Sequence, residues 1–177
     1  MADKRLFVGL PVSKELTEEL SSIIQTFSYP HWNWTKPSNF HLTVCFIGNV
    51  PEGKVEEVIS ALSQIPKPSF TMEADKIIPV MRKGKLNMLW VVFKTNETFI
   101  NISKEIHKAL NVNLEREPKA HITLCRVKAL NRESVSEKDF PQLSNTVLPV
   151  KNYILFESKS EGGGPTYIPL KILSAGD

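Results

Sequence analysis

Apolar and polar residues alternate strictly in two short segments, which read His-Leu-Thr-Val-Cys at residues 41–45 and His-Ile-Thr-Leu-Cys at residues 121–125. Alternation with a period of two is typical of a β-strand that buries one face. The pattern predicts that Leu42, Val44 and Phe46 of the first segment, and Ile122 and Leu124 of the second, face a core. The histidine, threonine and cysteine of each segment should share the opposite face, with the His and Thr side chains close together.

The rest of the pattern predicts both helices and strands. Apolar residues recur at helical spacing over about 13–27, 51–62 and 97–110, with Ser13 as the N-cap of the first helix. Strands are expected at 6–10, 70–81, 86–94, 147–150, 153–158 and 166–172, with a hairpin turn at 82–85. A helical segment precedes each of the two alternating segments. This order indicates two related halves that meet at a shared cleft, in an α+β fold with antiparallel sheets.

The bulk properties fit one globular domain, for which we expect residues 1–177 arranged in two lobes. The chain has 177 residues, of which 41% are hydrophobic and 23% charged. No segment approaches the ~20 apolar residues of a membrane span, and the apolar run at 6–10 is too short for a secretion signal. A cytoplasmic location is therefore expected. We also expect a monomer. The net charge of +3 is compatible with an anionic substrate but does not identify one.

Two histidines on matching strands are suited to acid–base chemistry, because imidazole exchanges protons near neutral pH. One ring can accept a proton from an attacking water while the other donates a proton to a departing oxygen. The two threonine hydroxyls can donate hydrogen bonds to the charged oxygens of a phosphate. This scheme requires neither a metal nor a cofactor, and it suits a strained phosphodiester.

The other candidate residues have simpler interpretations. Cys45 and Cys125 could be packing residues, a disulfide pair or half of a His₂Cys₂ metal site. Positions i and i+4 of a strand lie ~13 Å apart, too far for one metal, and a disulfide is disfavoured in the cytosol, so packing is the favoured interpretation. His107 is interpreted as a residue of a solvated helix face, His31 as a turn residue, and the basic segment 82–85 as a solvated turn.

The paired His-x-Thr motifs resemble those of the 2H phosphoesterase superfamily. The chain as a whole is similar to its RNA 2′,3′-cyclic phosphodiesterase branch, historically called 2′-5′ RNA ligases. The similarity is carried by residues 5–10, 34–43, 89–90, 120–127 and 158–163, with Pro165 and Tyr167. The resemblance implies a bilobal, pseudo-two-fold symmetric α+β fold in which antiparallel sheets line a central cleft and helices pack outside.

The resemblance also implies an activity, the metal-independent hydrolysis of a 2′,3′-cyclic phosphate at an RNA end to a 2′-phosphate. By this analogy His41 donates a proton to the departing 3′ oxygen, and His121 is the base that activates water. Thr43 and Thr123 would bind the phosphate. Substrates would be RNA with 2′,3′-cyclic phosphate ends or cyclic nucleotides.

Two further residues follow from the same analogy. Arg126 matches an arginine that assists the phosphate, and Phe46 has the equivalent offset in the first motif and would contact the nucleoside. Strict alternation places both on the face opposite the histidines unless a bulge intervenes. The family has alanine where this chain has Cys45 and Cys125, and a thiol exposed there would make the site sensitive to oxidants.

Other functions are compatible with the same motifs. The chain could be a 2′-5′ RNA ligase, or a phosphodiesterase acting on 2′-5′ oligonucleotides or on ADP-ribose cyclic phosphate. It could also be a non-catalytic module that binds RNA or a nucleotide. The two histidines favour an enzyme, because recognition alone does not need two titratable groups.

Overall fold

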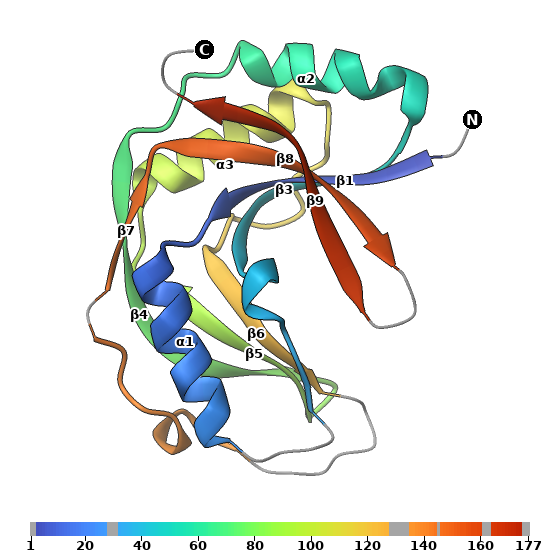
Figure 1. Ribbon diagram of the computed structural model, residues 1–177. Helices are drawn as coiled ribbons and strands as arrows, with labels where there is room; N and C mark the ends of the chain where they lie inside the picture. The colour runs from blue at the N-terminus through green and yellow to red at the C-terminus, as the bar shows by residue number, and fades with distance from the viewer. Residues whose placement is uncertain (1–2, 28–31, 128–134, 145, 161–163, 175–177) are drawn as a thin grey trace.

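The computed structural model describes residues 3–27, 32–127, 135–144, 146–160 and 164–174 of the chain (Figure 1). The elements in chain order are β1 (Asp3–Pro11), α1 (Lys14–Thr26), β2 (Trp32–Trp34), η1 (Pro37–Asn39), β3 (His41–Pro51), η2 (Glu52–Lys54), α2 (Val55–Ser63), β4 (Phe70–Arg82), β5 (Lys85–Phe93), α3 (Glu97–Ala109), β6 (His121–Val127), η3 (Glu137–Asp139), β7 (Val147–Val150), β8 (Asn152–Ser160) and β9 (Pro165–Ser174). None of the described helices is long and apolar enough to cross a membrane.

The predicted helices and hairpin are found close to their expected positions. The Ser13 side chain accepts a hydrogen bond from the Leu16 backbone N–H and caps α1, as predicted. The second helix begins later than predicted, because residues 52–54 form a 3₁₀ turn before α2. The turn between β4 and β5 has positive φ at Lys83 and at Gly84, as a two-residue type I′ hairpin requires.

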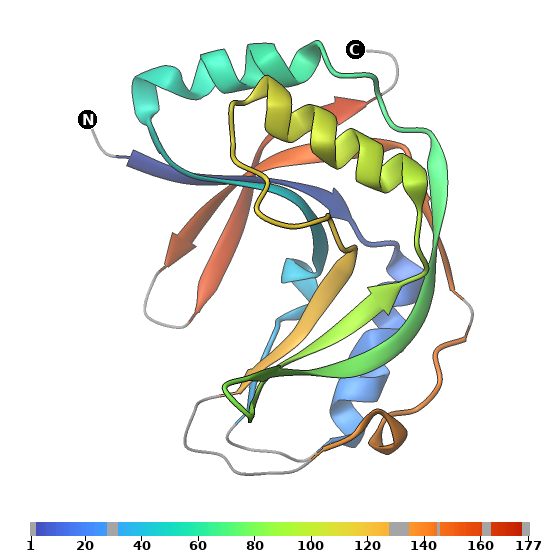
Figure 2. The ribbon, with the colours of Figure 1, turned by 180° about the vertical axis from the view of Figure 1, so that it is seen from behind.

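All strand pairs are antiparallel, and the strands follow the order β7-β4-β5-β6-β3-β1-β8-β9, with β2 paired to β6. The two predicted halves meet at β3 and β6, which pair through Leu42 and Ile122. On either side, β1–α1–β3 and β5–α3–β6 are equivalent strand–helix–strand units. The sheet curls around this junction, with α3 beside β3 and α2 beside α3 and β9, while α1 lies in front of β4 and β5 in the view of Figure 1 (Figures 1 and 2). The bilobal α+β prediction is confirmed.

A β-bulge in β3 overturns the predicted alternation of that strand. Thr43 and Cys45 pair with consecutive residues of β1, so Val44 is an extra residue in the ladder. Because the bulge exchanges the two faces of the strand, Cys45 turns into the core and is only 1% exposed. Phe46 turns to the face of His41 and is 47% exposed. The predicted faces of Cys45 and Phe46 were therefore wrong.

Strand β6 contains an equivalent β-bulge. Thr123 and Cys125 pair with consecutive residues of β5, which leaves Leu124 as the extra residue. Cys125 is fully buried and does not share the face of the histidine, contrary to the alternation pattern. Arg126 is turned to the face that carries His121 and Thr123, which resolves the conflict between its expected role and strict alternation.

The two cysteines are packing residues, as predicted. Both are free and buried. Burial raises the pKa of the Cys45 and Cys125 thiols to about 12, so both remain protonated near neutral pH. The exposed thiol on which oxidant sensitivity of the site depends is therefore not present at either position.

Candidate active site

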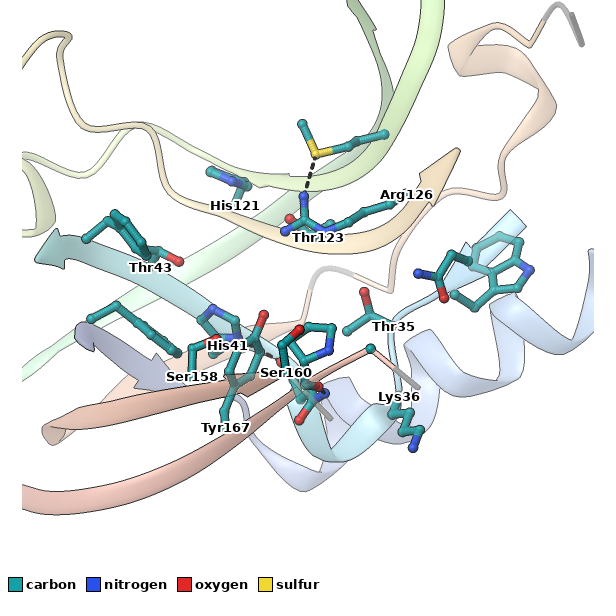
Figure 3. A pocket seen from close by; sticks show the side chains of 18 of the residues that line it. Thr35, Lys36, His41, Thr43, His121, Thr123, Arg126, Ser158, Ser160 and Tyr167 are labelled. Atoms are coloured by element: carbon teal, nitrogen blue, oxygen red, sulfur yellow. Dashed lines mark hydrogen bonds between the residues drawn. The ribbon is translucent and has the colours of Figure 1, made fainter. Parts of the chain in front are cut away.

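A cleft of about 570 Å³ opens along the junction of the two halves. The six residues predicted from sequence all line it, namely His41, Thr43 and Phe46 from β3 and His121, Thr123 and Arg126 from β6. Figure 3 shows His41 and Thr43 of β3 on one side of the cleft, with the labelled residues of β6 on the other. The structure therefore brings the predicted site together, with the bulges supplying the orientation of Phe46 and Arg126.

Both histidines are held by a main-chain carbonyl two residues earlier in the chain. Nδ1 of His41 lies 2.7 Å from the carbonyl oxygen of Asn39, and Nδ1 of His121 lies 2.8 Å from that of Lys119. A carbonyl oxygen can only accept, so in each ring Nδ1 carries the proton that is donated. This leaves Nε2 of each ring as the nitrogen available to a ligand in the cleft.

The surroundings of the two imidazoles differ. The His121 ring stacks on the Trp90 indole, with ring centroids 3.8 Å apart and an interplanar angle of 24°. The His41 ring instead contacts Phe7 and the edge-on ring of Tyr167, each with centroids 4.8 Å apart. The pseudo-symmetric histidines thus have different aromatic partners.

These aromatic partners were not assigned a site role from sequence. Phe7 belongs to a continuous apolar run, in which periodicity does not separate one face from the other. Trp90 and Tyr167 lie in segments that carry the family resemblance, and this was the available signal. The carbonyl partners could have been recognised from sequence, because Asn39 and Lys119 each lie two residues before a motif histidine.

Burial lowers the pKa of both histidines. For His41 the loss of solvation is the largest cause, opposed by the hydrogen bond to Asn39 and reinforced by the charges of His121 and Arg126. For His121 burial is again the largest cause, opposed by the bond to the Lys119 carbonyl and reinforced by the Lys119 and Arg126 charges. Both imidazoles are therefore mainly neutral at pH 7 in the free protein, and a bound anion would favour their protonation.

The cleft is suited to an anion. Arg5, Lys36 and Arg126 line it, and none of the described residues that line it is an aspartate or a glutamate. The Arg126 guanidinium makes a 3.3 Å contact with the Met88 sulfur, a weak acceptor, so most of its N–H groups remain available to a ligand. Arg5 lies over the Phe46 ring, with its guanidinium carbon 5.0 Å from the ring centroid.

The remaining candidates lie elsewhere or beyond the described residues. His107 is half-buried rather than fully solvated, and its Nδ1 donates to the Ser103 carbonyl at 2.7 Å, so its expected placement on a solvated face was only partly right. The basic residues of segment 82–85 are exposed at the hairpin tip and do not line the cleft. His31 lies outside the described residues. Within the described part of the chain, no group of three His, Cys, Asp or Glu side chains is placed to hold a metal ion.

Comparisons with known proteins agree with this fold. The family model described as LigT like Phosphoesterase matches residues 10–78. An RNA 2′,3′-cyclic phosphodiesterase of Archaeoglobus fulgidus is 24% identical over 173 residues, which cover 95% of this chain and 98% of that protein. A protein of the same name from Aquifex aeolicus is 28% identical over 145 residues, which cover 75% of this chain and 76% of that protein.

Solved structures share the whole fold. Escherichia coli LigT complexed with phosphate matches with a TM-score of 0.81 at 22% identity, over 98% of both chains. LigT complexed with 3′-AMP matches with a TM-score of 0.84 at 22% identity, over 99% of both chains. The cleft, its duplicated His-x-Thr strands and these likenesses lead to one conclusion. The chain is similar to the LigT-like phosphoesterases, in sequence over residues 10–78 and in fold over nearly its whole length.

Proposed function

We propose that this protein hydrolyses the 2′,3′-cyclic phosphodiester at the end of an RNA to a 2′-phosphomonoester, without a metal. The observation that carries the proposal is the matched pair of histidines, each with Nδ1 bound to a carbonyl and Nε2 left for the cleft. The similar proteins named RNA 2′,3′-cyclic phosphodiesterase support the substrate class. The LigT complexes with phosphate and with 3′-AMP support a nucleotide phosphate as the bound group.

In the proposed reaction, Nε2 of His121 accepts a proton from a water molecule while the water oxygen attacks phosphorus. The bond between phosphorus and O3′ breaks, and protonated Nε2 of His41 donates its proton to O3′. The products are a 2′-phosphate and a free 3′-hydroxyl. The proton gained by one ring and lost by the other is exchanged with solvent before the next turnover.

The charges around the two rings are compatible with this assignment of acid and base, which follows the family resemblance. The Lys119 and Arg126 charges both oppose a proton on His121, which favours the neutral ring that a base requires. The charges of His121 and Arg126 oppose a proton on His41. When the phosphate binds, its negative charge favours protonation of His41, the form that an acid requires.

The other cleft residues would hold the substrate. The Thr43 and Thr123 hydroxyls donate to the non-bridging phosphate oxygens, each such bond to a charged group being worth about 1.5–3 kcal/mol. Arg126 adds its guanidinium to the same oxygens. Phe46 offers its exposed ring to the nucleoside, with Arg5 over the ring.

The test is turnover of a short RNA with a 2′,3′-cyclic phosphate end in the presence of EDTA, with the product isomers separated. We expect a 2′-phosphate at an undiminished rate, whereas a 3′-phosphate or complete dependence on added metal would refute the mechanism. His41→Ala and His121→Ala should each remove nearly all turnover, and Lys151→Ala, an exposed change away from the cleft, should leave it unchanged. Wild-type rates in either histidine variant would exclude the two-histidine scheme.

Parallel assays distinguish the substrates that share this chemistry. Turnover is measured on 2′-5′-linked oligonucleotides, on ADP-ribose cyclic phosphate, and in the direction of RNA ligation. The proposal expects the cyclic RNA end to have the highest kcat/KM. Measurable binding of RNA with no hydrolysis at any pH would instead identify a binding module.

A further inference from the structure

The bulge in β3 inverts the faces of only two residues. A second irregularity follows it, because Phe46 and Gly48 pair with consecutive residues of β1 and leave Ile47 as an extra residue. Each bulge exchanges the faces of the strand, so two bulges restore the original alternation. The segment between them, Cys45 and Phe46, is therefore the only part of β3 whose faces are reversed.

A competing arrangement of this segment requires only a small change in register. Sliding the first bulge along β3 to meet the second would turn Phe46 into the core and Cys45 into the cleft, without changing the rest of the sheet. Both residue types are common in cores, although the larger phenylalanine would require the core around position 45 to repack. This alternative is also the arrangement that strict alternation in the sequence predicts, with Phe46 in the core and Cys45 in the cleft. A contact from outside the strand that holds the bulge would add to packing in selecting the observed register.

Ser103 of α3 makes such a contact. Its side chain is fully buried, and its hydroxyl donates to the carbonyl oxygen of Val44, the bulged residue, at 2.7 Å. Helical serines commonly bond their own helix, as Ser21 does to the Thr17 carbonyl at 2.6 Å and Ser63 to the Ile59 carbonyl at 2.9 Å. The Ser103 hydroxyl also lies 3.5 Å from Nδ1 of His107 in its own helix, but its short bond reaches from α3 to β3, which lies beside that helix in Figure 2.

The pseudo-symmetric bulge in β6 has a corresponding contact of a different kind. The carbonyl of its bulged residue, Leu124, accepts a hydrogen bond from the backbone N–H of Thr35 at 2.8 Å. A backbone donor is present whatever the side chain, whereas the donor to Val44 depends on a serine at position 103. We infer that Ser103 is a positioning residue that fixes the β3 bulge at Val44, and so keeps Phe46 in the cleft and Cys45 in the core.

Thiol alkylation under native conditions tests this inference directly, with each cysteine followed by peptide mass spectrometry. Both thiols react only when they leave the core, because burial holds their pKa at about 12. Ser103→Ala should raise the rate at Cys45 by about tenfold or more and leave Cys125 unchanged. The matched control is Tyr153→Phe, which removes another buried hydroxyl, a donor to the Leu62 carbonyl at 3.0 Å, and should leave the ratio of the two rates unchanged.

A second substitution separates a shifted bulge from general loosening. Lysine at position 46 resists burial, so Phe46→Lys should protect Cys45 again when combined with Ser103→Ala. In the wild-type background, Phe46→Lys should also slow the residual labelling of Cys45, which gives a test that does not require Ser103→Ala to fold. The inference is overturned if both cysteines become reactive together, if neither does, or if Cys45 stays reactive in the double variant.

The consequence for substrate rests on the proposed function. If Phe46 contacts the nucleoside, Ser103→Ala should raise KM for the RNA several-fold with a smaller change in kcat. A protein that hydrolyses no cyclic phosphate would refute the proposed function, and the labelling of Cys45 would still decide the role of Ser103. An unchanged KM together with selective labelling would show that the bulge moves but that Phe46 does not bind substrate.

Discussion

The stacking of His121 on Trp90 provides the sharpest prediction about the chemistry. In the proposed reaction His121 takes a proton from water and becomes an imidazolium ion, and its ring centroid lies 3.8 Å from that of the Trp90 indole at an interplanar angle of 24°. An aromatic face stabilises such a cation by about 0.5–2 kcal/mol. Trp90→Leu keeps an apolar side chain but removes this face. Since the cation forms in the reaction, the substitution should lower kcat by about 2- to 30-fold.

The assay is kcat for a cyclic phosphate substrate across the pH range. Without the indole the His121 ring is harder to protonate, so its pKa falls further and its limb of the profile moves to lower pH. Trp90→Phe is the control because it retains an aromatic face. It also removes the buried indole N–H, which has no hydrogen-bond partner among the described residues, so no bond is lost. An unchanged kcat in Trp90→Leu, a limb that moves to higher pH, or equal losses in both variants would refute the reasoning.

Two further predictions concern stability. Leu42→Ala removes a fully buried side chain at the pair that joins the lobes, and it should lower the free energy of unfolding in urea by about 2–5 kcal/mol; a loss below about 1 kcal/mol would mean that the junction is not a tightly packed core. The lowered pKa of His41 and His121 should make the melting temperature fall as the pH drops below 6.5, because the unfolded chain then binds protons that the folded protein resists. The stability that the two neutral histidines contribute is fully present above pH 6.5 and is lost as the pH falls below it. A double variant with glutamine at both positions should show a flatter dependence in that window, and an equally steep one would contradict the assignment.

The alternation pattern was sufficient to predict which strands carry the candidate site residues. His and Thr at positions i and i+2 lie on one face whatever follows them, so His41 with Thr43 and His121 with Thr123 could be placed together from local sequence alone. The repeat of a helical segment before each motif was likewise a local signal, and it predicted the two related units. These features survive in the structure because no distant contact is needed to produce them.

The residues after each threonine could not be placed in this way. The face of Phe46 or Arg126 depends on whether the strand is bulged, and that depends on register with a neighbouring strand. The donors to the bulged carbonyls are Ser103 and the backbone of Thr35, both far from the bulges in sequence. Periodicity within one segment contains no information on such contacts. The cysteines were assigned to the wrong face for the same reason, although their packing role was correct.

The carbonyl partners of the two histidines have a genetic consequence. In many histidine sites a carboxylate side chain selects the tautomer, and one point mutation abolishes that selection. Here the selecting oxygens belong to the peptide groups of Asn39 and Lys119, which every amino acid carries. Positions 39 and 119 can therefore vary without loss of tautomer control, provided that the backbone keeps its course. Variants with randomised side chains at positions 39 and 119 should therefore keep Nδ1 of both histidines protonated.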